Sequence, residues 1–229
     1  MSTRLTLVCL PPSPAEDVSD ALADALDSVD DEEFDSYEVG GDRYSGHFRH
    51  LPFAKEANDP RLIRTHPVRP GRCTGGPLGL LNLSWQRQSA TGVAADLFDS
   101  WTHGTSELPK ARTLAELRAE LGSGYAPIHA FRQQPRVLAV RDFATGPLWL
   151  PDMAALVALD RHAFIERARR RAVPGDSLLD LDGRWTTDPL WTQEDDDAET
   201  GSTAYTDHVN AYLDALDGDH IVVAVDCRR

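Results

Sequence analysis

Two continuous apolar runs, one near each end of the chain, constrain the fold of this 229-residue sequence more than any other feature. Residues 5–10 read LTLVCL and residues 221–225 read IVVAV. Short apolar runs rich in β-forming residues are typical of strands that are buried on both faces. We therefore predict an α+β fold, in which one mixed sheet has the N-terminal and C-terminal strands at its centre and helices packed on it.

Helical periodicity recurs in four stretches between these two runs. A capping box at Ser13–Glu16 precedes an apolar stripe that predicts a helix to about Ser28. A second capping box begins at Thr113 and predicts a short helix that Gly122 ends. Residues 151–172 and about 203–216 have the same spacing of apolar residues and are also predicted to be helical.

Two further pairs of short runs favour β-hairpins. Residues 127–131 and 136–143 are rich in β-forming residues and are separated by Gln133-Gln134-Pro135, so they predict two paired strands. Residues 178–181 lead into Asp182-Gly183, a dipeptide that favours a type I′ turn between two strands.

The charges of this chain are unevenly distributed. The 37 acidic and 23 basic side chains give a net charge of −14, which argues against general binding to nucleic acid or to an anionic membrane. Eleven carboxylates and no basic residue lie between Glu16 and Glu38, whereas seven Arg or Lys residues lie between Arg43 and Arg72. Either the two segments neutralise each other in the fold, or one of them faces a charged partner.

We expect a single domain over residues 1–229. It would carry an irregular basic insertion at about 42–76 and an acidic loop at about 194–200. Because the sequence lacks an apolar run long enough for a membrane span or a signal peptide, we expect a cytoplasmic protein. The three cysteines form no CxxC pair and are expected to be reduced and buried.

Candidate metal ligands are confined to the basic segment. Two histidines three residues apart can share a metal if the chain turns there, and two further side chains could complete a tetrahedral set. These candidate ligands are His47, His50, His66 and Cys73. The alternative is that the histidines are ordinary surface or hydrogen-bonded residues, so the cofactor is unknown and a metal ion is one possibility.

Other catalytic motifs are absent from the sequence. It contains no HExxH, GxSxG, GxGxxG or GxxxxGK[ST] pattern, and the glycine-rich stretch Gly71–Gly76 lacks the lysine of a phosphate-binding loop. The enzyme hypothesis therefore depends on the same four residues, either as metal ligands or through a Cys–His pairing of Cys73 with His66 or His50.

Arginines and aromatic residues of the same segment are the candidate binding residues. Five tryptophans lie in stretches predicted as loops or strand ends, where packing in the core or at its rim is the simplest role. If some of them converge with the arginines, the combination would resemble a protein-binding hot spot. The candidate residues are Arg43, Tyr44, Arg49, Arg64, Arg69, Arg72 and Trp85.

The chain resembles a group of small uncharacterised proteins of actinobacteria and their phages in the order of three features. These are a strand followed by a proline-led helix, a segment with a Gly-Gly pair between aromatic residues, and a closing helix and strand that ends in Asp-Cys. The matching pieces are Leu5–Leu26, Tyr37–Gly46 and Val223–Cys227, and the 179–185 hairpin is also similar. Asp42 and the C-terminal Arg228-Arg229 depart from the pattern of that group. Because that group has no established activity, the resemblance implies a phage or mobile-element context and nothing about catalysis.

The sequence thus leaves three functional hypotheses. The first is a non-enzymatic accessory protein that binds a protein partner through the arginines and aromatics. The second is a metal-dependent hydrolase that uses the His/Cys cluster. The third is an acidic mimic of nucleic acid, which the arginines between residues 43 and 72 disfavour. Neither the identity of a partner nor the oligomeric state can be predicted.

Overall fold

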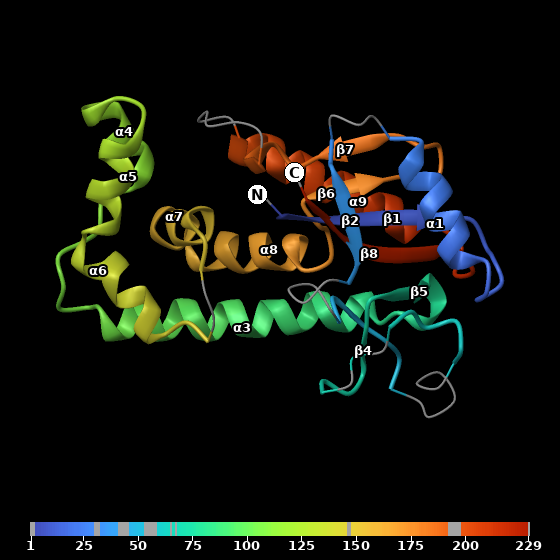
Figure 1. Ribbon diagram of the computed structural model, residues 1–229. Coiled ribbons are helices and arrows are strands. Elements are labelled where there is room, and N and C mark those ends of the chain that lie inside the picture. The colour runs from blue at the N-terminus through green and yellow to red at the C-terminus, as the bar shows by residue number, and fades with distance from the viewer. Residues whose placement is uncertain are drawn as a thin grey trace. The chain divides into compact units, whose positions relative to one another are not determined.

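The first and last strands lie side by side in the middle of one sheet (Figure 1). In the computed structural model, β1 (Thr3–Leu10) and β8 (Ile221–Arg228) pair antiparallel along their whole length, from Thr3 opposite Arg228 to Leu10 opposite Ile221. The structure describes residues 3–29, 33–40, 46–52, 59–64, 66, 68–145, 148–191 and 198–228.

Four shorter strands complete this sheet, which has the order β2-β8-β1-β6-β7 with β5 also on β8. β6 (Ser177–Leu179) is parallel to β1, and β7 (Trp185–Thr187) is antiparallel to β6. β2 (Ser36–Val39) and β5 (Gly75–Pro77) pair antiparallel with different parts of β8. The predicted mixed sheet with central terminal strands, and with it the α+β class, is confirmed.

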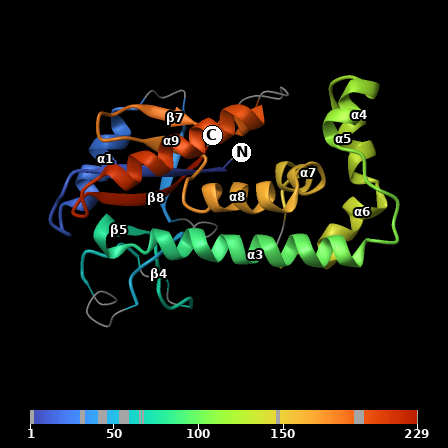
Figure 2. The same ribbon diagram turned by 180° about the vertical axis from the view of Figure 1, so that it is seen from behind.

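Helices cover both faces of the sheet because successive side chains of the central strands point to opposite sides. Val8 and Leu10 pack with α1 (Val18–Asp27). Leu7 and Cys9 pack on the other face with α9 (Ala198–Ala215), which crosses the sheet in Figure 2.

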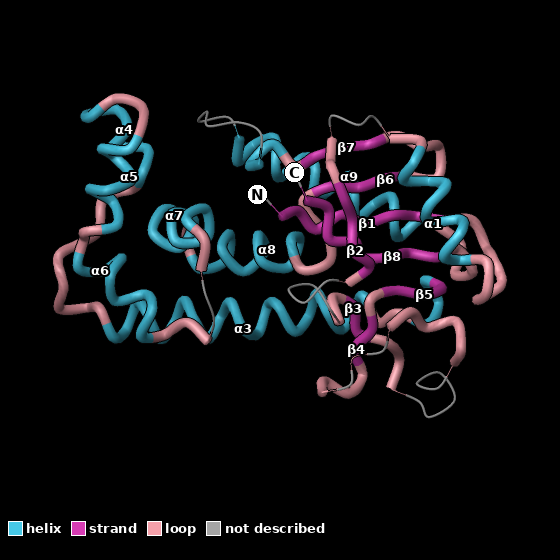
Figure 3. The backbone as a smooth tube through the Cα atoms, viewed as in Figure 1, coloured by secondary structure: helices cyan, strands magenta, loops and turns pink. Residues whose placement is uncertain are grey.

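A separate two-stranded ladder lies within the basic segment. β3 (Phe48–Arg49) and β4 (Arg72–Cys73) pair antiparallel, and Figure 3 shows both beside β5. Phe48 and Cys73 are fully buried in the core cluster on the α9 face. Part of the segment that we predicted to be irregular is therefore an ordered hairpin, with Ile63 bridged to Gly75.

The chain divides into two compact units, and the sequence carried no clear signal for this division. The first comprises Met1–Arg87 and Arg170–Arg229, and the second comprises Gln88–Arg169. The described part of the second unit is helical. Its elements, some of which extend into the first unit, are α3 (Leu83–Gly104), α4 (Leu114–Leu121), α5 (Tyr125–Arg132), α6 (Pro135–Leu138), the 3-10 helix η2 (Ala139–Asp142), α7 (Leu150–Ala158) and α8 (Arg161–Arg171).

The hairpin predicted over 127–143 is wrong, because these residues form α5, α6 and η2. Phe131, Val137 and Val140 are buried among the helices of the second unit, so tertiary packing overrides their β propensity. The single helix predicted over 151–172 is two helices, since Asp160 begins α8 by accepting a hydrogen bond from the Ala163 N–H at 2.8 Å.

Two local details also differ from prediction. The residues before Val18 form a turn, in which the Ser13 hydroxyl donates to the Pro11 carbonyl rather than capping a helix. The β6–β7 hairpin is confirmed, but only Gly183 in its turn has a positive φ, +76°, so the turn is not type I′. Two further 3-10 helices are η1 (Leu78–Leu80) and η3 (Pro189–Trp191).

The predicted acidic loop at 194–200 lies mostly outside the described residues. Its end is not a loop, because α9 begins at Ala198.

Candidate protein-binding surface

The β3–β4 ladder places two arginines on one face of a small hairpin. Arg49 lies directly opposite Arg72, and Phe48 lies opposite Cys73. Since neighbouring residues of a strand point to opposite faces, the burial of Phe48 and Cys73 turns the two arginines away from the core.

The start of α3 fixes the backbone of Arg49. The Arg49 carbonyl accepts from the Asn82 N–H at 2.6 Å, and the Arg49 N–H donates to Oε1 of Gln86 at 3.3 Å. Nε2 of Gln86 donates in turn to the Ala172 carbonyl at 2.7 Å. Asn82 also caps the helix, because its Oδ1 accepts from the Trp85 N–H at 3.2 Å. Arg49 is therefore held by a helix terminus as well as by its own ladder.

The guanidinium of Arg49 lies over the indole of Trp85. Its Cζ atom is 4.0 Å from the ring centroid, which is within the range of a cation–π contact. Trp85 remains 36% exposed. An arginine and an aromatic ring are thus held together where another molecule can reach them.

Arg72 is partly buried and close to other positive charges. Its Nη1 donates to the Gly46 carbonyl at 3.2 Å and lies 3.4 Å from the His47 carbonyl. The pKa of Arg72 lies below the ordinary value because burial disfavours the charged form, and because Arg49 and Arg69 add positive charge nearby.

A tight turn presents Val68 and Arg69. The Nδ1 atom of His66 accepts from the N–H groups of Val68 at 3.2 Å and Arg69 at 3.0 Å, which fixes this turn from within. Val68 is 81% exposed, and Arg69 is exposed. An apolar side chain and a charged side chain are therefore both displayed here.

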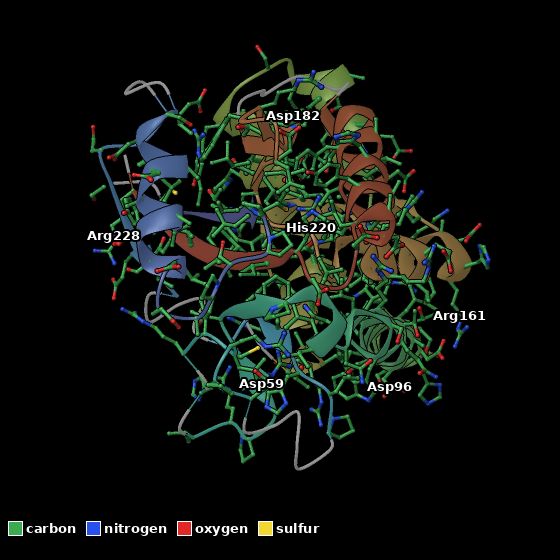
Figure 4. The ribbon with its side chains drawn as sticks, turned by 90° about the vertical axis from the view of Figure 1, so that its right-hand side faces the viewer. Asp59, Asp96, Arg161, Asp182, His220 and Arg228 are labelled. Carbon is green, nitrogen blue, oxygen red and sulfur yellow. The ribbon has the colours of Figure 1, made fainter. Side chains whose placement is uncertain are left out.

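We define the arginine–tryptophan surface as the set Arg49, Val68, Arg69, Arg72 and Trp85. Among the described residues, none of its arginines forms an ion pair with a carboxylate. Asp59, which Figure 4 labels in the segment between β3 and β4, pairs instead with Arg61 at 3.0 Å.

Of the other predicted binding residues, Arg64 is directed away from this surface. Arg64 has a positive φ of +41° and donates through Nη1 to the Val39 carbonyl at the end of β2. Arg43 and Tyr44 lie outside the described residues.

The remaining tryptophans have other surroundings. Trp101 is buried in the second unit and donates to the Arg136 carbonyl at 2.8 Å. Trp185 stacks on Phe34, with 5.8 Å between ring centroids. Trp149 is exposed in the second unit, and the side chain of Trp191 lies outside the described residues.

The candidate metal ligands do not converge. Within the described ranges, no group of three or more His, Cys, Asp or Glu side chains is placed to hold a metal ion. His47 Nε2–H donates to the Val173 carbonyl at 2.9 Å, and His50 Nδ1–H donates to the Leu51 carbonyl at 2.8 Å. Burial raises the pKa of Cys73 to about 12. His66 fixes the turn before Arg69.

All three cysteines are free and buried, as predicted. Burial, the largest cause in each case, raises the pKa of Cys9 to about 12 and that of Cys227 to about 11. These thiols are therefore poor nucleophiles.

Sequence reasoning missed Asn82, Gln86 and Val68 as parts of this site. Asn82 directly before Leu83-Ser84 is a recognisable helix-cap signal, but the apolar stretch before it made the local structure ambiguous. No pattern in the sequence indicates that Gln86 bridges Arg49 to Ala172, because that bridge depends on the fold.

Comparisons with known proteins give no match. No protein-family model, no curated protein and no solved structure is significantly similar to this chain. Over the part of the chain that the structure describes, no helix combines the length and apolar character needed to cross a membrane.

Proposed function

We propose that this protein is a non-enzymatic accessory protein that binds a protein partner through the arginine–tryptophan surface. The observation that carries the proposal is the guanidinium of Arg49, which lies over the partly exposed ring of Trp85 and has no carboxylate partner among the described residues. Arginine and tryptophan, together with tyrosine, are enriched at the energetic centres of protein interfaces. The resemblance to phage and actinobacterial proteins adds the further proposal of a phage or mobile-element context.

The geometry supports a low entropic cost of binding. The backbone of Arg49 is hydrogen-bonded through both its N–H and its carbonyl, and Arg72 is held by backbone carbonyls. Groups that are already fixed in the free protein lose less conformational freedom when a partner docks. The exposed Val68 supplies apolar area beside the charges.

Site-specific photo-cross-linking tests the proposal. A photoreactive amino acid at Val68 should link the full-length protein to a discrete partner in a lysate of the source cells. The same residue at Val93, which is 55% exposed on α3, is the matched control and should not give that product.

Variants then connect the product to the site. We expect the double variant Arg49→Ala, Trp85→Ala to lower the yield at least about tenfold, because it removes the anchor pair. The double variant Arg132→Ala, Arg141→Ala, which changes two exposed arginines of the second unit, should leave the yield unchanged. Equal products from Val68 and Val93, or a yield that Arg49→Ala, Trp85→Ala does not change, would contradict the proposal.

A further inference from the structure

Like charges gather on the arginine–tryptophan surface, and no carboxylate of the described residues pairs with them. Arg49 and Arg72 are direct cross-strand neighbours, a position where like charges destabilise a sheet. Arg69 lies close enough to Arg72 to act on it electrostatically. The positive end of the α3 dipole is at the same place, since Trp85 lies in the first turn of that 22-residue helix. A bound anion would relieve this accumulation of positive charge.

The backbone of the hairpin offers few free donors to such an anion. The N–H groups of His50, Leu51 and Arg72 donate to the carbonyls of other residues. Those of Val68 and Arg69 donate to His66, and that of Arg49 donates to Gln86. Phosphate-binding loops depend on several free N–H groups that converge on one point, and these paired groups do not provide them.

The donors that remain are guanidinium groups at separate positions. The side chains of Arg49 and Arg69 form no hydrogen bond or ion pair within the described residues, and Arg72 uses only Nη1. A guanidinium presents planar pairs of N–H donors that match one carboxylate each. The guanidinium groups of Arg49 and Arg72 on the hairpin and of Arg69 on the turn are at separate positions. They therefore suit several carboxylates spaced along a peptide.

We propose that the element recognised on the partner is a carboxylate-rich peptide segment, which binds across Arg49, Arg69 and Arg72 beside Trp85. This inference rests on the proposed function and names the chemistry of the partner. The 37 acidic side chains of the chain, none of which belongs to this surface, repel such a segment elsewhere, so the surface also orients its approach.

Nuclear magnetic resonance of the full chain tests the inference. The protein labelled with ¹⁵N has five tryptophans, and the indole signal of Trp85 is identified from the Trp85→Phe variant. The probe is a twelve-residue peptide of alternating Gly and Glu, and the control probe replaces each Glu with Gln. We expect the Glu peptide to shift the Trp85 signal and the Gln peptide to leave it in place.

Two double variants then distinguish the effect of net charge on peptide binding from the effect of where the arginines lie. Arg49→Gln, Arg69→Gln should weaken binding of the Glu peptide at least about tenfold, whereas Arg132→Gln, Arg141→Gln, with the same net charge, should not. Because Arg49 and Arg69 have no hydrogen-bonded side-chain partner in the described chain, neither substitution removes a contact of the core.

Three outcomes would overturn the inference. These are equal shifts from the Glu and Gln peptides, equal loss of binding in both variants, and at least about tenfold tighter binding of a phosphoserine peptide or a single-stranded oligonucleotide. If the Val68 cross-link depends on Arg49 and Trp85 but the Glu peptide does not bind, the partner-binding function stands and the carboxylate chemistry fails. If neither is observed, both fail.

Discussion

At the scale of single residues, Arg72 shows how the fold holds a charge that it does not neutralise. Its guanidinium is partly buried, and the groups that fix it are neutral backbone carbonyls. Burial and the neighbouring arginines both disfavour its charged form. A structural arginine is usually paired with a carboxylate, as Arg167 is with Asp152 at 2.9 Å. Among the described residues, Arg72 has no such carboxylate partner.

His47 gives a prediction about pH. Burial lowers the pKa of its imidazole to about 4. The hydrogen bond to the Val173 carbonyl raises this pKa in part, and the positive charge of Arg72 lowers it further. In the unfolded chain the pKa is about 6.5, so the unfolded state binds more protons between these values and stability falls as pH falls. We expect the free energy of unfolding to lose about 3 kcal/mol at most from this group between about pH 7 and pH 4.

His47→Gln removes this titration and keeps a side chain that can donate to the Val173 carbonyl. Urea unfolding at several pH values should therefore show a smaller loss of stability at low pH in His47→Gln than in the natural protein. The exposed His103 supplies the control variant His103→Gln, which should follow the natural protein. Parallel pH curves for the natural protein and His47→Gln would contradict this account of the imidazole.

The sequence indicated some residues that lie together in the structure, but it did not indicate their contacts. Arg49, Arg72 and Trp85 were predicted as binding residues, and the structure places them together. His47 and His66 were candidates for metal binding and instead hold backbone groups. A histidine looks the same in a sequence whether its ring binds a metal or a carbonyl, because the partner comes from a distant part of the chain.

At the scale of elements, two glycines with free space around them should respond oppositely to the same substitution. Gly183 has a φ of +76° in the β6–β7 turn, and Gly92 lies within α3. A Cβ atom at either position would meet nothing within 4 Å. Gly183→Ala should therefore destabilise the protein by about 1 kcal/mol through backbone strain alone. Gly92→Ala should stabilise it by about 0.5–1 kcal/mol through helix propensity.

Thermal and urea unfolding check both glycine variants. Gly183→Asn is a further control, since asparagine tolerates a positive φ better than alanine and should cost less. A stabilising Gly183→Ala or a destabilising Gly92→Ala would show that the local backbone differs from the one described.

The sequence predicted well those elements whose local residue pattern favours the same secondary structure as their packing in the fold. The central strands are continuously apolar, and the capping box of Thr113 and Glu116 is present, with the Thr113 N–H donating to Glu116 at 2.7 Å. The stretch 127–143 failed because its β-forming residues are buried by neighbouring helices, which a single sequence does not reveal.

At the scale of the whole molecule, the acidic helix α1 and the hairpin that carries Arg49 and Arg72 belong to different faces of the sheet in the first unit. The aspartates of α1 lie on the helix that covers one face of the sheet. The hairpin with Arg49 and Arg72 is anchored through Phe48 and Cys73 to the core on the other face. Among the described residues, no ion pair joins the 16–38 and 43–72 segments, so direct neutralisation of one by the other is not observed.

The measurement that tests the central claim most directly is hydrogen–deuterium exchange of the full chain with and without the cross-linked partner. We predict slower amide exchange in peptides covering 46–51, 68–74 and 83–87, because these segments carry the arginine–tryptophan surface. The exposed Leu121, Tyr125 and Leu138 of the second unit provide the internal comparison, and exchange there should not change. Protection confined to residues 114–142, with the hairpin unchanged, would contradict the proposed surface.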